Sequence, residues 1–107
     1  MQRPDISDSV LLQSIEALTV NMGKRIEEKG RGAFASHHEM LGAITEEYHE
    51  LVEAVRLNSA VDVAGELTDI AVACLFSIAT MMEAEVQIKA AQEALEAEVD
   101  AIQGSES

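Results

Sequence analysis

The sequence predicts an all-α protein: a helical bundle of about four helices, completed by oligomerisation. Of its 107 residues 48% are hydrophobic and only 3% are aromatic, a composition that favours helices over sheets. The only proline is Pro4, so long stretches contain no helix breaker. We expect a single domain over residues 1–107, with frayed ends at 1–5 and 104–107.

The first predicted helix begins after Asp5 or Ser7, either of which can cap it, and ends near Lys29. Apolar residues recur along it at steps of three and four, which predicts one apolar stripe: Leu11, Ile15, Leu18, Met22 and Ile26. A loop follows over residues 30–35, where two glycines fit a helix C-cap and a turn. Phe34 is expected to anchor this loop on the core.

The second predicted helix opens with a capping box, with Ser36 as the N-cap and Glu39 three residues later. Its predicted buried stripe is Leu41, Ile44, Tyr48, Leu51 and Val55. Glu47 and Glu50 lie at the edge of that stripe and are expected to point inward. Glu46 and Glu53 are expected to face water.

A third helix is predicted after the break at Asn58-Ser59, with Ser59 and Asp62 in capping-box positions. From Ile70 to Met82 nearly every side is apolar or small, which is typical of a buried helix and calls for a partner subunit. Apolar residues continue on a seven-residue spacing: Leu67, Cys74, Met81, Ile88, Leu95 and Ile102. The sequence leaves open a single helix over 59–103 or a bend near residues 80–85 that gives a compact bundle.

The net charge of −13, from 20 acidic and 7 basic residues, argues against binding to nucleic acid or to an anionic membrane. The N-terminal residues lack the apolar run of a signal peptide, and the run from Ile70 to Met82 is shorter than a bilayer span. A soluble, cytoplasmic protein is therefore expected. Cys74 lies in that apolar run and is interpreted as a small buried hydrophobe.

Two pairs of acids carry the functional signal, Glu47-x-x-Glu50 and Glu66-x-x-Asp69. A spacing of three stacks both acids of a pair on one face of a helix. Two such helices can bring four carboxylates into one gap, where the charges repel unless a cation lies between them. Hard divalent ions such as Mg²⁺ or Mn²⁺ suit a site made only of carboxylates.

Other carboxylate and nucleophile chemistries fail on spacing. A ferritin-like di-iron site needs two Glu-x-x-His motifs; Glu46-x-x-His49 supplies one, and no histidine follows His49. The His-Glu-x-x-His motif of zinc proteases is absent. One cysteine and no Gly-x-Ser-x-Gly element give a nucleophile-led mechanism no support.

The two acidic motifs, with the gap between them and the Leu in each, resemble the all-α NTP pyrophosphohydrolases of the MazG and dimeric dUTPase kind. The resemblance covers roughly residues 36–82. It implies a Mg²⁺-dependent enzyme, with Mn²⁺ as a substitute, that cleaves an NTP or dNTP to the monophosphate and pyrophosphate. It also implies a homodimer or homotetramer of helical subunits.

The same resemblance implies roles for individual residues. Glu47, Glu50, Glu66 and Asp69 would bind the metal, and one of them, Glu47 in the first instance, or Glu46 would orient or deprotonate the attacking water. Family members often carry a basic segment after the second motif that contacts phosphates or base, whereas here Lys89 is the only cation of that segment.

Four of the seven basic residues fall within eight positions: Lys24, Arg25, Lys29 and Arg31. They suit the negative end of a helix dipole, and their concentration in an acidic chain also makes them candidates for phosphate binding. The alternative to an enzyme is a non-catalytic helical assembly or regulatory protein. Its acids would be a solvated helix face or a remnant of a metal site.

Overall fold

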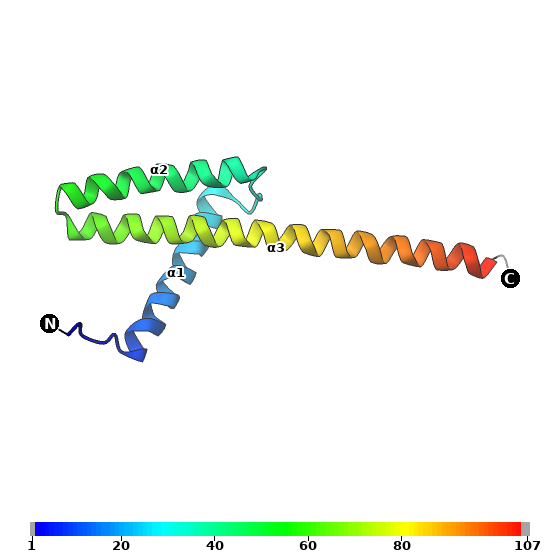
Figure 1. Cartoon of the computed structure of the whole chain (residues 1–107), viewed down its shortest axis with the longest axis horizontal. Coiled ribbons are helices and arrows are strands. Elements are labelled where there is room, and N and C mark those ends of the chain that lie inside the picture. Colours follow the sequence, from blue (N-terminus) through cyan, green and yellow to red (C-terminus); the bar gives the residue numbers. More distant parts are fainter. Residues whose placement is uncertain (1, 106–107) are drawn as a thin grey trace. The chain divides into compact units, whose positions relative to one another are not determined.

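The computed structural model describes residues 2–105 and contains three helices over that range, α1 (Asp8–Lys29), α2 (His37–Arg56) and α3 (Ala60–Ser105) (Figure 1). No strand occurs among these residues, which confirms the all-α class. The expected count of about four helices becomes three over the described residues, because residues 60–105 form one continuous helix. Gly104 and Ser105, placed in a frayed end by the sequence, lie within α3, and residues 106–107 lie outside the described range.

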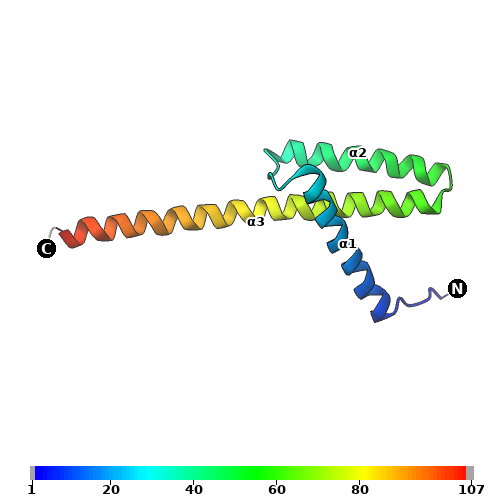
Figure 2. The ribbon, with the colours of Figure 1, turned by 180° about the vertical axis from the view of Figure 1, so that it is seen from behind.

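The chain divides into two compact units, one ending at Ser77 and one beginning at Ile78. In the first unit α2 runs alongside the first part of α3 in the opposite direction, and α1 crosses α3, as the views from both sides show (Figures 1 and 2). The second unit is helical to Ser105, and every side chain in it from Met81 to Ser105 is exposed. The acidic motifs therefore belong to the first unit alone.

Serine caps begin all three helices. The Ser7 hydroxyl accepts a hydrogen bond from the Val10 N–H at 3.3 Å, so Ser7, not Asp5, caps α1. Ser36 accepts from the Glu39 N–H at 3.1 Å and Ser59 from the Asp62 N–H at 3.3 Å, as their spacing predicts.

The core of the first unit is small and lies where α2 and α3 meet. Five apolar side chains are buried among residues 2–105: Met40, Ala54, Val72, Ala73 and Phe76. Phe34 packs edge-on against Phe76, with ring centroids 5.4 Å apart. The loop over residues 30–36 is thus anchored on the core by Phe34, as predicted.

The predicted buried stripe of α2 is wrong in its phase. Leu41, Tyr48 and Val55 are 62%, 56% and 58% exposed, and only Ile44 and Leu51 of that set are half-buried. The buried or half-buried positions include Met40, Ala43, Glu47 and Ala54, again at helical steps. Small side chains let α2 approach α3 closely, so the inward face is the one that carries Glu47.

The apolar surface of α3 is not covered within a single chain. Val72, Ala73, Phe76 and Ser77 are buried, and Cys74 is half-buried. Ile70 is half-buried, and four large side chains of the expected buried run are exposed: Leu75, Ile78, Met81 and Met82. Burial of all the apolar faces of α3 by a partner subunit therefore stays a prediction.

Helix α3 is also long and apolar enough to cross a membrane by length and composition. It contains an 18-residue window of mean hydropathy 1.5 with no more than two charged residues, of which 22% is buried. One such helix is weak evidence for a membrane span, because the criterion considers length and composition alone. Core helices of soluble proteins meet it as well, so the cytoplasmic location stays a prediction.

Candidate metal centre

The hairpin of α2 and α3 brings the two acidic motifs opposite each other. The turn contains Asn58, whose φ of 55° is left-handed, a conformation that Asn tolerates better than most residues. Glu47 and Asp69 lie eleven positions on either side of Asn58, and Glu50 and Glu66 lie eight positions on either side. Residues equally distant from the turn of an antiparallel helix pair lie at about the same level, so the spacing brings the two motifs side by side, and the rotation of each helix decides which acids meet.

Three of the four predicted metal ligands form a compact group. Glu47, Glu66 and Asp69 each offer a carboxylate oxygen, and these three oxygens lie within 4.8 Å of one another. Opposite ligands of an octahedral Mg²⁺ are about 4.2 Å apart, twice the usual Mg–O distance. The three carboxylates fit a hard divalent cation after a small inward movement of their side chains.

Two oxygens of this group are buried and have no hydrogen-bond partner among the described residues. They are Oε2 of Glu47 and Oε2 of Glu66, each from a half-buried side chain. A buried carboxylate oxygen without a donor or cation is strongly unfavourable. The arrangement is therefore one that a cation would stabilise.

The electrostatics of Glu47 and Glu66 agree with this geometry. Burial, first of all, and the neighbouring carboxyl groups of Glu66, Glu50 and Asp69 together raise the pKa of Glu47 from 4.5 to about 7. Burial and the neighbouring Glu50 and Asp69 also raise the pKa of Glu66. Near neutral pH the group holds a proton where a cation would otherwise bind.

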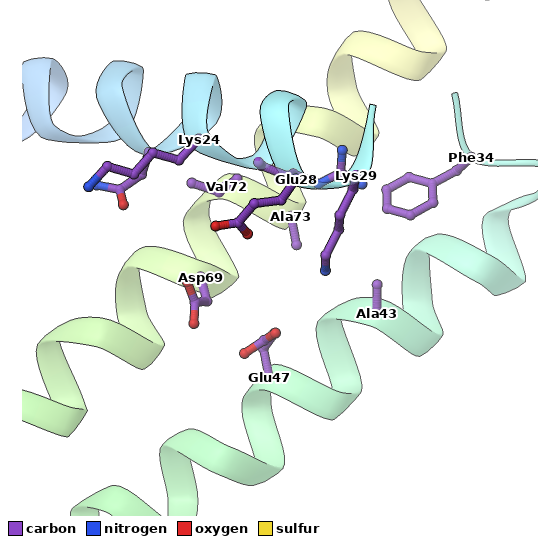
Figure 3. Close-up of a pocket in the computed structure, with 11 residues that line it drawn as sticks. Lys24, Glu28, Lys29, Phe34, Ala43, Glu47, Asp69, Val72 and Ala73 are labelled. Atoms are coloured by element: carbon purple, nitrogen blue, oxygen red, sulfur yellow. The ribbon is translucent and has the colours of Figure 1, made fainter. Parts of the chain in front are cut away.

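A pocket of about 460 Å³ opens beside this acidic group, within the first unit. Glu47 from α2 and Asp69 from α3 line it on one side, and Val72 and Ala73 contribute small apolar surface. The carboxylates of Glu28, Glu47 and Asp69 point into the same space from three helices (Figure 3). This volume is in the range of small-molecule sites.

Helix α1 forms the basic side of the pocket. Lys24, Arg25 and Lys29, three of the four cations proposed for phosphate binding, line it. Lys29 extends from α1 towards α2 near Ala43, whereas Lys24 lies along α1 (Figure 3). Arg31, the fourth cation, is exposed and does not line the pocket.

The Arg25 side chain is held against aromatic rings. Its guanidinium carbon lies 3.5 Å from the Phe76 ring centroid and 5.5 Å from that of Phe34, an arrangement that favours a cation over the ring face. Partial burial lowers the pKa of the Arg25 guanidinium below its usual range. The loop anchor Phe34 thus also positions a cation of the pocket.

The structure does not bring every predicted residue into the group. Glu46 is exposed and does not line the pocket. Glu50 is exposed and outside the group of three, although it influences the pKa of Glu47 and Glu66.

Two further polar residues line the pocket that the sequence did not single out, Asn21 and Glu28 of α1. Their spacing from Lys24 and Arg25, at helical steps of three and four, is the signal that could have identified them.

Comparisons of the chain with models of known protein families, with curated proteins and with solved structures found no match.

Proposed function

We propose that this protein is a Mg²⁺-dependent nucleoside triphosphate pyrophosphohydrolase, with Mn²⁺ as a substitute metal. The observation that carries the proposal is the pair of buried, partnerless carboxylate oxygens of Glu47 and Glu66 beside Asp69. Glu47, Glu66 and Asp69 would hold the metal, and Glu50 would contribute negative charge from the edge of the group. The type of reaction is proposed from the resemblance of the two acidic motifs to the all-α pyrophosphohydrolases.

In the proposed reaction water cleaves the anhydride link between the α- and β-phosphoryl groups, and its oxygen and protons end on the two products, monophosphate and pyrophosphate. The bound cation would neutralise phosphate charge and lower the pKa of a coordinated water. Arg25 and Lys29 would neutralise further phosphate charge from the α1 side. A pocket-lining carboxylate would orient the attacking water, and Glu28, which lines the pocket outside the metal group, is better placed than Glu46, which does not line it.

Burial favours this function over the alternative of a solvated acidic face. A solvated face predicts that all four acids point to water, as the exposed Glu46 and Glu53 do. Glu47 and Glu66 instead bury an oxygen each and sit beside a pocket that also contains cations. A merely solvated acidic face accounts for neither the buried oxygens nor the adjacent pocket.

A pyrophosphate-release assay with a panel of ribo- and deoxyribonucleoside triphosphates tests the proposal. With Mg²⁺ present we expect release from at least one triphosphate, and none after chelation of the metal. Asp69→Asn and Glu66→Gln are expected to lower kcat by about a hundredfold or more, since each removes a metal ligand. Glu96→Gln, an exposed acid of the second unit, is the control and should match the wild type.

Two results would contradict the proposal. One is unchanged activity in Asp69→Asn and Glu66→Gln, which would remove the assigned residues from the reaction. The other is no release from any triphosphate together with no effect of Mg²⁺ on the melting temperature. That second result would favour the non-catalytic alternative.

A further inference from the structure

We infer that the α1 side of the pocket is a polyphosphate subsite, in which Arg25 and Lys29 bind the terminal phosphates and make the polyphosphate, not the base, the main recognition element. This rests on the proposed function for the identity of the whole substrate. The subsite itself can be tested with inorganic tripolyphosphate, which has no nucleoside.

Arg25 lacks a carboxylate partner although the chain is rich in acids. The sequence holds 20 acidic and 7 basic residues, yet among residues 2–105 the one ion pair found joins Arg56 and Glu53, at 4.0 Å. Arg25 is half-buried, stacked on Phe76, and lines the pocket. An arginine held rigidly with its donors unpaired is suited to bind phosphate oxygens in two-point contacts.

The position of Lys29 adds to this observation. Arg25 and Lys29 are four residues apart on α1, a spacing at which like charges repel on a helix surface. The helix dipole explains a cation in the last turn, where Lys29 lies. The dipole does not explain Arg25, which lies one turn earlier and is partly buried against the rings of Phe34 and Phe76. Glu28, which also lines the pocket from α1, offsets part of this repulsion, and a bound anion between the two side chains would offset more of it.

The pocket is acidic on its α2 and α3 side and has an excess of cations on its α1 side, where Lys24, Arg25 and Lys29 outnumber Glu28. Carboxylates from α2 and α3 lie on one side, and the Lys29 ammonium extends into the space from α1 (Figure 3). A polyphosphate held at one end through a cation at the carboxylates carries further negative charge towards α1. The basic side therefore complements the part of the substrate that the metal leaves unneutralised.

Little in the pocket is able to read a nucleobase. Phe34 is the one aromatic residue in its lining, and that ring already packs against Phe76 and lies near Arg25. Asn21 is the one side-chain amide, and the apolar lining consists of Ala43, Val72 and Ala73. We expect kcat/KM to vary less than about tenfold among bases, because discrimination needs hydrogen bonds that a mismatched base leaves unmade.

Calorimetric titration of the full chain with tripolyphosphate, in excess Mg²⁺, tests the subsite. We expect saturable binding that Lys29→Gln and Arg25→Gln each weaken by about tenfold or more. Lys89→Gln removes an exposed cation of the second unit and should change the Kd less than about twofold, by the same reasoning. Arg25→Lys keeps the charge and loses the planar fork, so it should lie between wild type and Arg25→Gln.

The outcomes separate this inference from the proposed function. Wild-type affinity for tripolyphosphate in both Lys29→Gln and Arg25→Lys would overturn the subsite, even if triphosphates are hydrolysed. Tripolyphosphate binding that depends on Arg25 and Lys29, with no hydrolysis of any triphosphate, would support the subsite and contradict the enzyme. Because Arg25→Gln also removes a stacked side chain, circular dichroism of each variant checks folding, and Lys29→Gln provides the test without that stack.

Discussion

The Glu47 side chain occupies a position on the inward face of α2 where an apolar residue would ordinarily lie. Met40, Ala43 and Ala54 share that face, and Oε2 of Glu47 is buried without a partner. A carboxylate at such a place costs stability unless a cation or a proton accompanies it. The residue is therefore interpreted as a functional group that the fold tolerates.

The first prediction for a single residue concerns Glu47→Gln, which replaces the carboxylate by a neutral amide, and its effect on stability. In metal-free buffer near pH 8, Glu47→Gln should raise the free energy of unfolding by on the order of 1 kcal/mol, because it removes a poorly solvated charge. With Mg²⁺ the wild type should gain stability and the variant should not. Urea denaturation with and without Mg²⁺ measures both effects.

Glu46→Gln is the matched control, since the adjacent Glu46 is exposed. It should leave the metal-free stability unchanged and keep the full response to Mg²⁺. An equal loss of the Mg²⁺ response in Glu46→Gln and Glu47→Gln would contradict the assignment of Glu47.

The second prediction concerns pH. The pKa of Glu47 is raised from 4.5 to about 7 in the folded protein, so between these values the folded state holds a proton that the unfolded chain has released. The free energy of unfolding should therefore fall as the pH rises from 4.5 to about 7 and level off above that range. We expect a fall on the order of 1–2 kcal/mol from this group, since water screens part of the effect.

Urea denaturation across this pH range, compared between wild type and Glu47→Gln, isolates the contribution of Glu47 from that of the other acids. The difference between the two proteins should shrink towards low pH, and saturating Mg²⁺ should reverse its sign near pH 8. Parallel pH profiles for the two proteins without metal would show that Glu47 titrates normally.

Much of the site could be predicted from single residues and their spacing. Glu47, Glu66 and Asp69 were identified from two helical pairs, because a spacing of three and a turn midway between the motifs bring the two pairs side by side. The prediction that Glu50 points inward is wrong, since Glu50 is exposed, and the prediction that Glu46 faces water is confirmed. Both positions depend on the rotation of α2 about its axis. That rotation is set by contacts of small residues such as Ala54, which carry little hydrophobic signal.

At the scale of elements, the connection between α1 and α2 positions the basic side of the pocket. Gly30 ends α1 with φ of 81° and ψ of −175°, and its N–H donates to the Ile26 carbonyl at 2.8 Å. This backbone region is essentially restricted to glycine. The turn then places Phe34 against Phe76, and Phe76 contacts Arg25.

The prediction for this element compares two glycines of one loop. Gly30→Ala should lower the free energy of unfolding by about 1–3 kcal/mol because alanine is strained at this φ and ψ. Gly32 has a φ that other residues adopt and open space around its Cα, so Gly32→Ala should change stability by less than about 1 kcal/mol. Urea denaturation of both variants provides the measurement, and equal losses would contradict the role given to Gly30.

The continuity of α3 shows the limit of prediction for an element. The sequence left open a bend near residues 80–85, because a seven-residue apolar spacing fits either one helix or two packed helices. No Gly or Pro lies there to force a break, and the helix runs from Ala60 to Ser105. The apolar spacing fits both one long helix and two packed helices, and residues with high helix propensity favour the continuous helix.

For the whole molecule, the apolar surface left uncovered by one chain is the main unexplained feature. Exposed large apolar side chains in the second unit keep the seven-residue spacing: Met81, Ile88, Leu95 and Ile102. Contiguous exposed apolar surface in a soluble protein usually marks an interface. A homodimer or homotetramer that buries this stripe is the expected assembly.

The prediction at this scale is a change of oligomeric state in solution. Sedimentation equilibrium should give a dimer or tetramer for the wild type, and Leu95→Glu should shift it towards monomer by placing a charge on the apolar stripe. Ala97→Glu adds the same charge on the other side of the helix, where it is exposed, and should leave the assembly intact. A monomeric wild type, or equal dissociation by both variants, would contradict the interface.

Binding of a divalent ion at Glu47, Glu66 and Asp69 is the central claim for the molecule as a whole. Titration of the full chain with Mn²⁺, followed by the electron paramagnetic resonance signal of the free ion, measures it most directly. We predict saturable binding that Mg²⁺ displaces, and that Glu66→Gln and Asp69→Asn weaken by tenfold or more while Glu96→Gln does not. Binding that is equal in all four proteins, or absent from the wild type, would contradict the claim.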